Sequence, residues 1–211
     1  VEGWYADPEA RYYGGRYYIY VTKSFTDRSG QLNIDAFSST DLLHWEKHPD
    51  ILDMSGYPYV HKAVWAPTVI EKNGQYYLIF ASNDIQNNEE RGGLEISVSD
   101  SPTGPFTNHI GRTLVDRFIN YAQPIDAHLF KDDGAVYLYY GGWEHCNVAR
   151  MNEEMNGFMP FENGEIFKPV TPDNYVEGPC MLKRNGVYHF MWSQGDWING
   201  TYHVWASSST S

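Results

Sequence analysis

A glycine-centred β-hairpin recurs four times along the chain, and this repetition restricts the fold more than any single residue does. The turn glycines are Gly15, Gly74, Gly134 and Gly186, spaced by 59, 60 and 52 residues. Each lies between two runs of β-branched and aromatic residues, and glycine accepts the positive φ angles of the tight turns that join antiparallel strands. The sequence therefore predicts four hairpins of the same design.

Further strand-like runs follow each hairpin. Third strands are expected at 33–39, 94–99, 147–151 and 202–207, and short aromatic fourth strands at 42–47, 102–106 and 156–161. Four strands per unit, repeated every 50 to 60 residues or so, are typical of a β-propeller. We expect an all-β fold: one β-propeller domain over residues 1–211 with about four blades. The fourth unit stops after its third strand, so this reading also expects the domain to be incomplete at its C-terminal end.

Composition limits the possible partners. The chain has 17 Tyr and 7 Trp, which suits a β protein with a binding groove, and its formal net charge is -12. Such a charge disfavours nucleic acid, because binding phosphates requires clustered Lys and Arg. No apolar run approaches the length of about 18 residues that a membrane span requires. We expect no nucleic-acid partner and no membrane span.

The sequence offers little sign of a metal or redox site. Cys146 and Cys180 lie in different repeats without metal-ligand spacing, so free thiols are expected, with a disulfide as the alternative. The Asp132-Asp133-Gly134 segment resembles part of a calcium loop but lacks the further acidic ligands, and turn chemistry explains it. We expect that no cofactor is required.

Acidic residues recur at or next to the same position, counted back from the turn glycine, in three of the four repeats. Eight positions before each turn glycine stand Asp7, Ala66, Asp126 and Gly178, and Glu177 lies one position earlier in the fourth repeat. The inner strands of a propeller surround one axis. Carboxylates at equivalent positions of these strands would therefore lie close together at one end of the axis and repel one another. A structural role at strand starts would explain one such acid more easily than three. The one-residue offset of Glu177 has no explanation in the sequence.

The motif series that carries these acids resembles glycoside hydrolase family 43. It consists of Asp7-Pro8, Val64-Trp65-Ala66-Pro67, Ile125-Asp126 before an Asp-Asp-Gly hairpin, and Glu177-Gly178-Pro179. The resemblance runs over the whole chain in order and implies a five-bladed propeller and an inverting hydrolase of arabinose- and xylose-containing polysaccharides. It implies that Asp7 is the general base, Glu177 the general acid and Asp126 the acid that tunes Glu177. Many members of the family hold a calcium ion or a water cluster on the propeller axis, and this sequence gives no support for such a calcium site.

Physical reasoning agrees with these roles. Inversion needs one carboxylate to activate water and one protonated carboxyl group to protonate the departing oxygen. A charged Asp126 near Glu177 would raise the pKa of Glu177, and Asp7 in a wetter setting would stay ionised. Sugar rings stack on aromatic side chains, and the expected substrate-binding aromatic residues are Trp4, Trp65, Trp143, Tyr175 and Trp197, of which Trp65 matches the resemblance. Gln194 is expected to hydrogen-bond sugar hydroxyls, with a solvated loop position as the alternative. Trp143 and Trp197 fit a pocket or a core equally well, whereas Trp45, Trp192 and Trp205 are expected in the core.

The sequence thus predicts an exo-acting inverting enzyme, an α-L-arabinofuranosidase or β-xylosidase, whose partner is a neutral oligosaccharide or polysaccharide of the plant cell wall. An endo-acting arabinanase is the alternative within the class, and the loops 83–93 and 118–123 would decide between pocket and cleft. A propeller lectin that binds sugar without cleaving it is the alternative outside the class. We expect an extracellular or periplasmic location.

Overall fold

The computed structural model describes residues 3–25, 27–196 and 198–210. The chain divides into two compact units, Val1–Asp116 and Arg117–Ser211, which are described separately. Besides strands, the regular elements of the described residues are two short 3-10 helices, η1 (Arg28–Gly30) and η2 (Met54–Gly56). In the part of the chain that the structure describes, no helix has the length and apolar character needed to cross a membrane.

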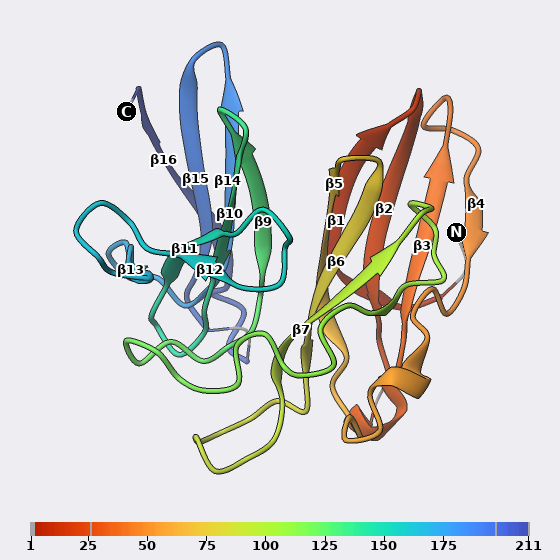
Figure 1. The fold of residues 1–211 in the computed structure, drawn as a ribbon, viewed down its shortest axis with the longest axis horizontal. Helices are drawn as coiled ribbons and strands as arrows, with labels where there is room; N and C mark the ends of the chain where they lie inside the picture. The colour runs from red at the N-terminus through yellow and green to blue at the C-terminus, as the bar shows by residue number, and fades with distance from the viewer. Residues whose placement is uncertain (1–2, 26, 197, 211) are drawn as a thin grey trace. The chain divides into compact units, whose positions relative to one another are not determined.

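The first unit contains two four-stranded antiparallel sheets, each a meander in chain order (Figure 1). One comprises β1 (Tyr5–Tyr13), β2 (Arg16–Lys23), β3 (Ile34–Ser39) and β4 (Glu46–His48). The other comprises β5 (Trp65–Lys72), β6 (Gln75–Ser82), β7 (Gly93–Ser99) and β8 (Thr107–Asn108). The central strands β3, β6 and β7 are almost entirely buried, as expected for β-branched and aromatic runs covered on both faces.

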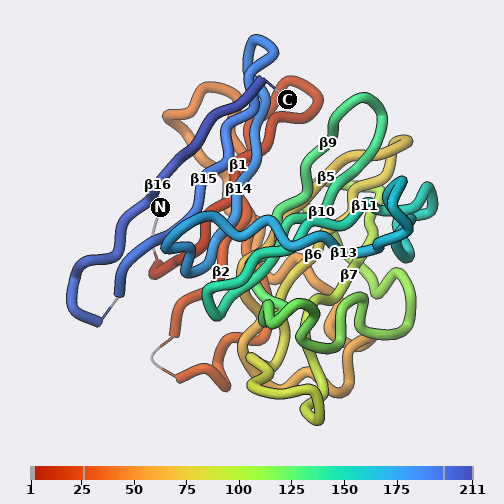
Figure 2. The backbone as a smooth tube through the Cα atoms, turned by 90° about the vertical axis from the view of Figure 1, so that its left-hand side faces the viewer, coloured from red at the N-terminus to blue at the C-terminus, as the bar shows by residue number. Residues whose placement is uncertain are grey.

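The second unit repeats the same plan. One sheet comprises β9 (His128–Asp132), β10 (Ala135–Tyr140), β11 (Asn147–Met151) and β12 (Phe158–Met159), with β13 (Phe167–Pro169) also pairing with β11. The last comprises β14 (Glu177–Arg184), β15 (Val187–Gln194) and β16 (His203–Ser209), which Figure 2 traces as neighbouring strands. Antiparallel meanders of this kind, with three or four consecutive strands each, are the blades of a β-propeller, so the predicted all-β propeller class is confirmed.

All four predicted hairpin turns are present, and each has two consecutive residues with positive φ. The pairs are Gly14 and Gly15, Asn73 and Gly74, Asp133 and Gly134, and Asn185 and Gly186, with φ between 47° and 84°. Two positive φ angles define the turn whose twist matches that of antiparallel strands, and Asn, Asp and Gly tolerate them best. The turn residues therefore fix the register of each hairpin.

A second positive-φ position recurs eight residues before each turn glycine. Asp7, Ala66, Asp126 and Gly178 have φ of 50°, 47°, 53° and 69°. In β1, β5 and β14 the pairing register also shifts at this point, which marks a β-bulge. In the fourth repeat Gly178 occupies the left-handed position, and Glu177 stands directly before it.

Aromatic residues form much of the interior. In the first unit the largest cluster includes Tyr20, Tyr57, Phe80 and Phe106, all at most 1 % exposed. In the second unit Trp192 packs with Cys146 and Tyr175, so its predicted core position is confirmed. The same prediction was wrong for Trp205, which is 53 % exposed because it lies on β16, whose outer edge has no partner strand among the described residues.

Both cysteines are free, as expected. Cys146 is buried and Cys180 is partly buried, and the two take part in no disulfide. Burial raises the pKa of the Cys146 thiol to about 12, so this side chain stays neutral and behaves as a small apolar residue.

Candidate active site

Asp7 lies at the bulge of β1, where its carboxylate contacts β2 and β5. The hydroxyl of Thr22 donates a hydrogen bond to Asp7 Oδ2 at 2.6 Å, and the backbone N–H of Ala66 donates to Thr22 Oγ1 at 2.8 Å. Because Thr22 accepts from Ala66, its own proton is free to point at Asp7. Thr22 thereby connects the bulges of two neighbouring blades and orients the predicted general base.

The environment of Asp7 adjusts its basicity. Asp7 is an exposed residue, yet desolvation of its carboxyl group by the surrounding protein raises the pKa of this group above its ordinary value. The Thr22 hydroxyl and the Ala66 N–H act in the opposite direction and stabilise the ionised form. A raised pKa makes a carboxylate a stronger base, which suits general-base catalysis as long as the group is ionised at the working pH.

Replacing Thr22 with valine is expected to move the acid limb of the activity profile to higher pH. The substitution keeps the side-chain shape but removes the donor to Asp7 Oδ2, so the pKa of Asp7 rises further. A base must be deprotonated, so activity falls as pH drops below that pKa. The measurement is kcat/KM against pH, with Thr22→Ser as the control because serine keeps the hydroxyl. An unchanged acid limb in Thr22→Val would contradict this role of Thr22.

Trp65 opens β5, next to Ala66, and its indole is fixed from two sides. The ring nitrogen donates to Gln31 Oε1, and the guanidinium carbon of Arg28 lies 5.4 Å from the ring centroid. Arg28 is held in turn by an ion pair with Asp84. Trp65 remains partly exposed. The sequence did not predict its contacts with Gln31 and Arg28, because they depend on tertiary backbone hydrogen bonds between 28–31 and the segment 63–64 just before β5.

Asp126 and Glu177 are brought together in the second unit. A Cβ built on Gly178 would lie 4.0 Å from Asp126 Oδ2 and 3.2 Å from Ser193 Oγ, so the Asp126 carboxylate faces the backbone directly after Glu177. The hydroxyl of Tyr202 donates to Glu177 Oε1 at 3.0 Å. Partial burial, together with the charges of Glu177 and Asp126, raises the pKa of Tyr202, so this hydroxyl remains a donor.

Gly178→Ala is expected to lower the free energy of unfolding by about 1–2 kcal/mol, because alanine is strained at positive φ. The φ of Gly178 is +69°, and the new Cβ would press on Ser193 Oγ. The matched control is Gly157→Ala, whose Cβ would meet only Asn152 Nδ2 at 3.7 Å, an ordinary contact. Urea unfolding measures both variants, and an equal loss in the two would refute the bulge as the cause.

The predicted sugar-binding residues of the second unit differ in their accessibility. Trp143 is 51 % exposed and packs edge-on against Phe118, with ring centroids 4.9 Å apart. Gln194 is partly exposed and donates to the carbonyl of Asp173 at 3.0 Å. Trp197 lies outside the described residues. In the first unit, Trp4 is 86 % exposed, and its carbonyl accepts from Ser24.

The interpretation of Tyr175 as a stacking residue is corrected by the structure. Its side chain is 2 % exposed, and its hydroxyl donates to the carbonyl of Gly141 at 2.6 Å. Burial raises the pKa of this hydroxyl well above its ordinary value. An enclosed ring offers no face to a sugar, so Tyr175 fixes the backbone at the end of β10 instead.

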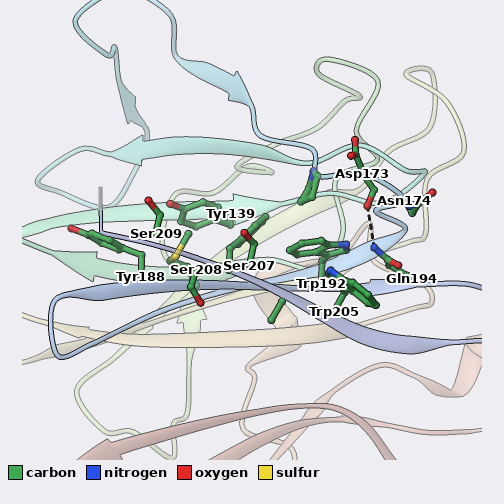
Figure 3. Close-up of a pocket in the computed structure, with 14 residues that line it drawn as sticks. Tyr139, Asp173, Asn174, Tyr188, Trp192, Gln194, Trp205, Ser207, Ser208 and Ser209 are labelled. Carbon is green, nitrogen blue, oxygen red and sulfur yellow. Dashed lines mark hydrogen bonds between the residues drawn. The ribbon is translucent and has the colours of Figure 1, made fainter.

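A cavity of about 830 Å³ lies in the second unit, beside β15 and β16 (Figure 3). Trp192 and Trp205, a directly opposed cross-strand pair, contribute to its wall together with Tyr139, Tyr188 and Gln194. Neither Asp126 nor Glu177 lines it. The cavity borders the edge of β16 that has no partner among the described residues, and we do not assign it to substrate.

Metal-binding side chains are dispersed across the described residues. Over 3–25, 27–196 and 198–210, no group of three or more His, Cys, Asp or Glu side chains is placed to hold a metal ion. The acids Asp132 and Asp133 lie at the β9–β10 turn, where Asp132 binds Lys183 at 2.7 Å and Tyr188. These contacts give Asp132 a structural role that joins two blades of the second unit.

Comparisons with known proteins agree with this picture. The family model of Glycosyl hydrolases family 43 matches residues 1–211. The chain is 41% identical to the protein named Beta-D-galactofuranosidase xynD from Aspergillus niger, over 96% of this chain and 60% of that protein. It is 27% identical to a Beta-xylosidase from Xylanibacter ruminicola, over 90% and 72% of the two chains. The crystal structure of an alpha-L-arabinofuranosidase from Clostridium thermocellum superposes with a TM-score of 0.79 at 26% identity, over 97% of this chain and 68% of the other.

Proposed function

Because the chain belongs to glycosyl hydrolases family 43, we propose that it hydrolyses glycosidic bonds with inversion and releases a terminal furanose from plant cell-wall oligosaccharides or polysaccharides. The chain spans 60% of the length of its Aspergillus niger relative, so this proposal concerns the protein to which these residues contribute. One observation carries it: three carboxylates stand at the recurring left-handed position, Asp7 and Asp126 on the positive-φ residue itself and Glu177 directly before it.

Each carboxylate has a distinct role in the proposal. Asp7, oriented by Thr22 and with a raised pKa, takes a proton from the attacking water. Glu177 gives a proton to the departing oxygen, and the nearby Asp126 carboxylate favours the protonated form of Glu177 through like-charge repulsion. Tyr202 holds one oxygen of Glu177 and so orients the other toward the leaving group. No cofactor is needed for these proton transfers.

We propose an α-L-arabinofuranoside as the first substrate and a β-D-galactofuranoside as the second candidate. The alpha-L-arabinofuranosidase that shares the fold supports the first, and the relative named as a galactofuranosidase supports the second. The two sugars have the same ring configuration and differ by one hydroxymethyl group, so a pocket for one can be built from a pocket for the other. A β-D-xyloside is the third candidate, supported by the relative named as a xylosidase.

A panel of nitrophenyl glycosides tests the substrate, and proton NMR of the first-formed sugar tests the stereochemistry. We expect turnover of a furanoside and a product whose anomeric configuration is inverted. A retained configuration would overturn the assignment of Asp7 as a base. Binding without turnover of any substrate would favour a carbohydrate-binding propeller, and cleavage of internal bonds in linear arabinan would favour an endo-acting arabinanase. We further propose an extracellular or periplasmic location, where such polymers occur.

A further inference from the structure

A surface hollow of about 650 Å³ lies in the first unit, next to the cluster that holds Trp65. It is lined by Ser29, Tyr59, His61, Lys62 and Arg91, with Asn83, Glu90 and Pro58. The segment before Trp65 pairs with η1, because Ala63 N–H donates to the carbonyl of Arg28 at 3.1 Å and Val64 N–H to that of Gln31 at 2.9 Å. The hollow and the Trp65 cluster thus share the same two segments.

The hollow gathers positive charge in an acidic protein. Lys62 and Arg91 line it, and the imidazole of His61 lies in the same lining. None of the three forms an ion pair with a carboxylate among the described residues. The one acid in the lining, Glu90, accepts from the N–H of Gln86 and from Asn87 Nδ2, at 3.0 and 2.9 Å. The cations therefore remain available to a ligand.

Arg91 is held in place by a chain of contacts that begins in the interior. Glu95 is fully buried and accepts hydrogen bonds from Tyr59, Ser82 and Thr113 at 2.8, 2.9 and 3.1 Å. The ring of Tyr59, fixed by this bond, carries the Arg91 guanidinium 3.9 Å from its centroid. A stacked guanidinium loses little freedom on binding and presents a planar fork that matches a carboxylate.

Asn83 fixes the walls of the hollow. Its side-chain amide donates to the carbonyls of Tyr59 and Arg91, at 2.9 and 2.7 Å, and its side-chain oxygen accepts the N–H of His61 at 2.8 Å. The buried side chain of Asn83 therefore ties the segment 59–61 to the backbone of Arg91. The basic groups stand on a prearranged frame, which lowers the entropic cost of binding.

We propose that this hollow is a subsite for an acidic sugar, in which Arg91 and Lys62 bind the carboxylate of a uronic acid residue carried by the substrate chain. The inference rests on the proposed function only in taking the carboxylate to belong to a polysaccharide. A neutral sugar would leave these cations without a partner. The net charge of -12 repels polyanions, but a single carboxylate on an otherwise neutral chain can approach such a local patch.

The test compares two ligands that differ by one charged group: xylotriose and xylotriose with a single glucuronic acid branch. Affinities are measured by calorimetry at low and at physiological salt, with Glu177→Gln protein so that turnover does not interfere. We expect the acidic ligand to bind about tenfold more tightly, the value of one charge-assisted hydrogen bond, and the preference to shrink with salt. Equal affinities for the two ligands would overturn the proposal.

Variants test whether Arg91 and Lys62 cause the tighter binding of the acidic ligand. Arg91→Gln and Lys62→Gln should each reduce it, whereas Arg184→Gln makes the same change in net charge on an exposed residue of the other unit and should leave it intact. A preference that survives in the double variant, or that Arg184→Gln removes equally, would also overturn the subsite. Turnover of a neutral nitrophenyl furanoside by the unmodified protein reports on the proposed function alone, so the two failures can be told apart.

Discussion

Replacing Glu177 with alanine is expected to lower kcat/KM on oligosaccharides by about 10²–10⁴-fold, the usual contribution of a positioned general acid. The loss should depend on the leaving group. A sugar hydroxyl leaves only when it is protonated, whereas dinitrophenolate leaves without a proton. We therefore expect the variant to hydrolyse a dinitrophenyl furanoside at nearly the normal rate. The measurement is kcat/KM across a series of aryl leaving groups with increasing phenol pKa.

Two controls keep this result interpretable. Glu177→Gln keeps the shape of the side chain and its contact with Tyr202 but cannot donate the same proton, so it should behave like the alanine variant. Glu162→Gln removes an exposed acid from the same unit and should leave kcat/KM unchanged. Normal hydrolysis of both activated and unactivated substrates by Glu177→Ala would refute the assignment, as would an equal loss on both.

The repeat pattern was sufficient to predict the strands, because turn residues and β-branched runs act locally. The third strand expected at 147–151 is found as β11 at Asn147–Met151. The short outer strands were placed less well. The run 42–47 was expected as a strand, but β4 begins only at Glu46, since the Asp41 carboxylate accepts the N–H groups of Leu43 and His44 and holds a turn there.

The sequence predicted the site residues whose type is unusual at their position. It did not predict the residues whose contacts depend on the register between strands. Asp7, Asp126 and Glu177 stood out as acids at strand starts. Thr22 and Tyr202, which orient two of them, belong to neighbouring strands or to the segment before β16, and their approach follows from the bulges. A bulge shifts the pairing by one residue and so redirects every side chain beyond it. The sequence contains no local signal for that shift.

Replacing Asp7 with asparagine is expected to lower kcat/KM by about 10²–10⁴-fold on every substrate, whatever its leaving group. The attacking water needs a base in each case, so the dinitrophenyl furanoside should not escape the loss. Asparagine is the informative choice, because Asp7 has φ of 50° and Asn is among the few residues that tolerate this conformation. Alanine would mix backbone strain with the loss of the base.

The matched control is Asp133→Asn, the same chemical change at φ of 47° in the β9–β10 turn. It should leave kcat/KM unchanged, which shows that a left-handed Asp→Asn change is harmless in itself. The contrast with Glu177→Ala distinguishes the two roles. A good leaving group should restore the activity of Glu177→Ala but not that of Asp7→Asn. If Asp7→Asn were also rescued by dinitrophenolate, Asp7 would be assisting the departing oxygen, and the roles of the two carboxyl groups would have to be exchanged.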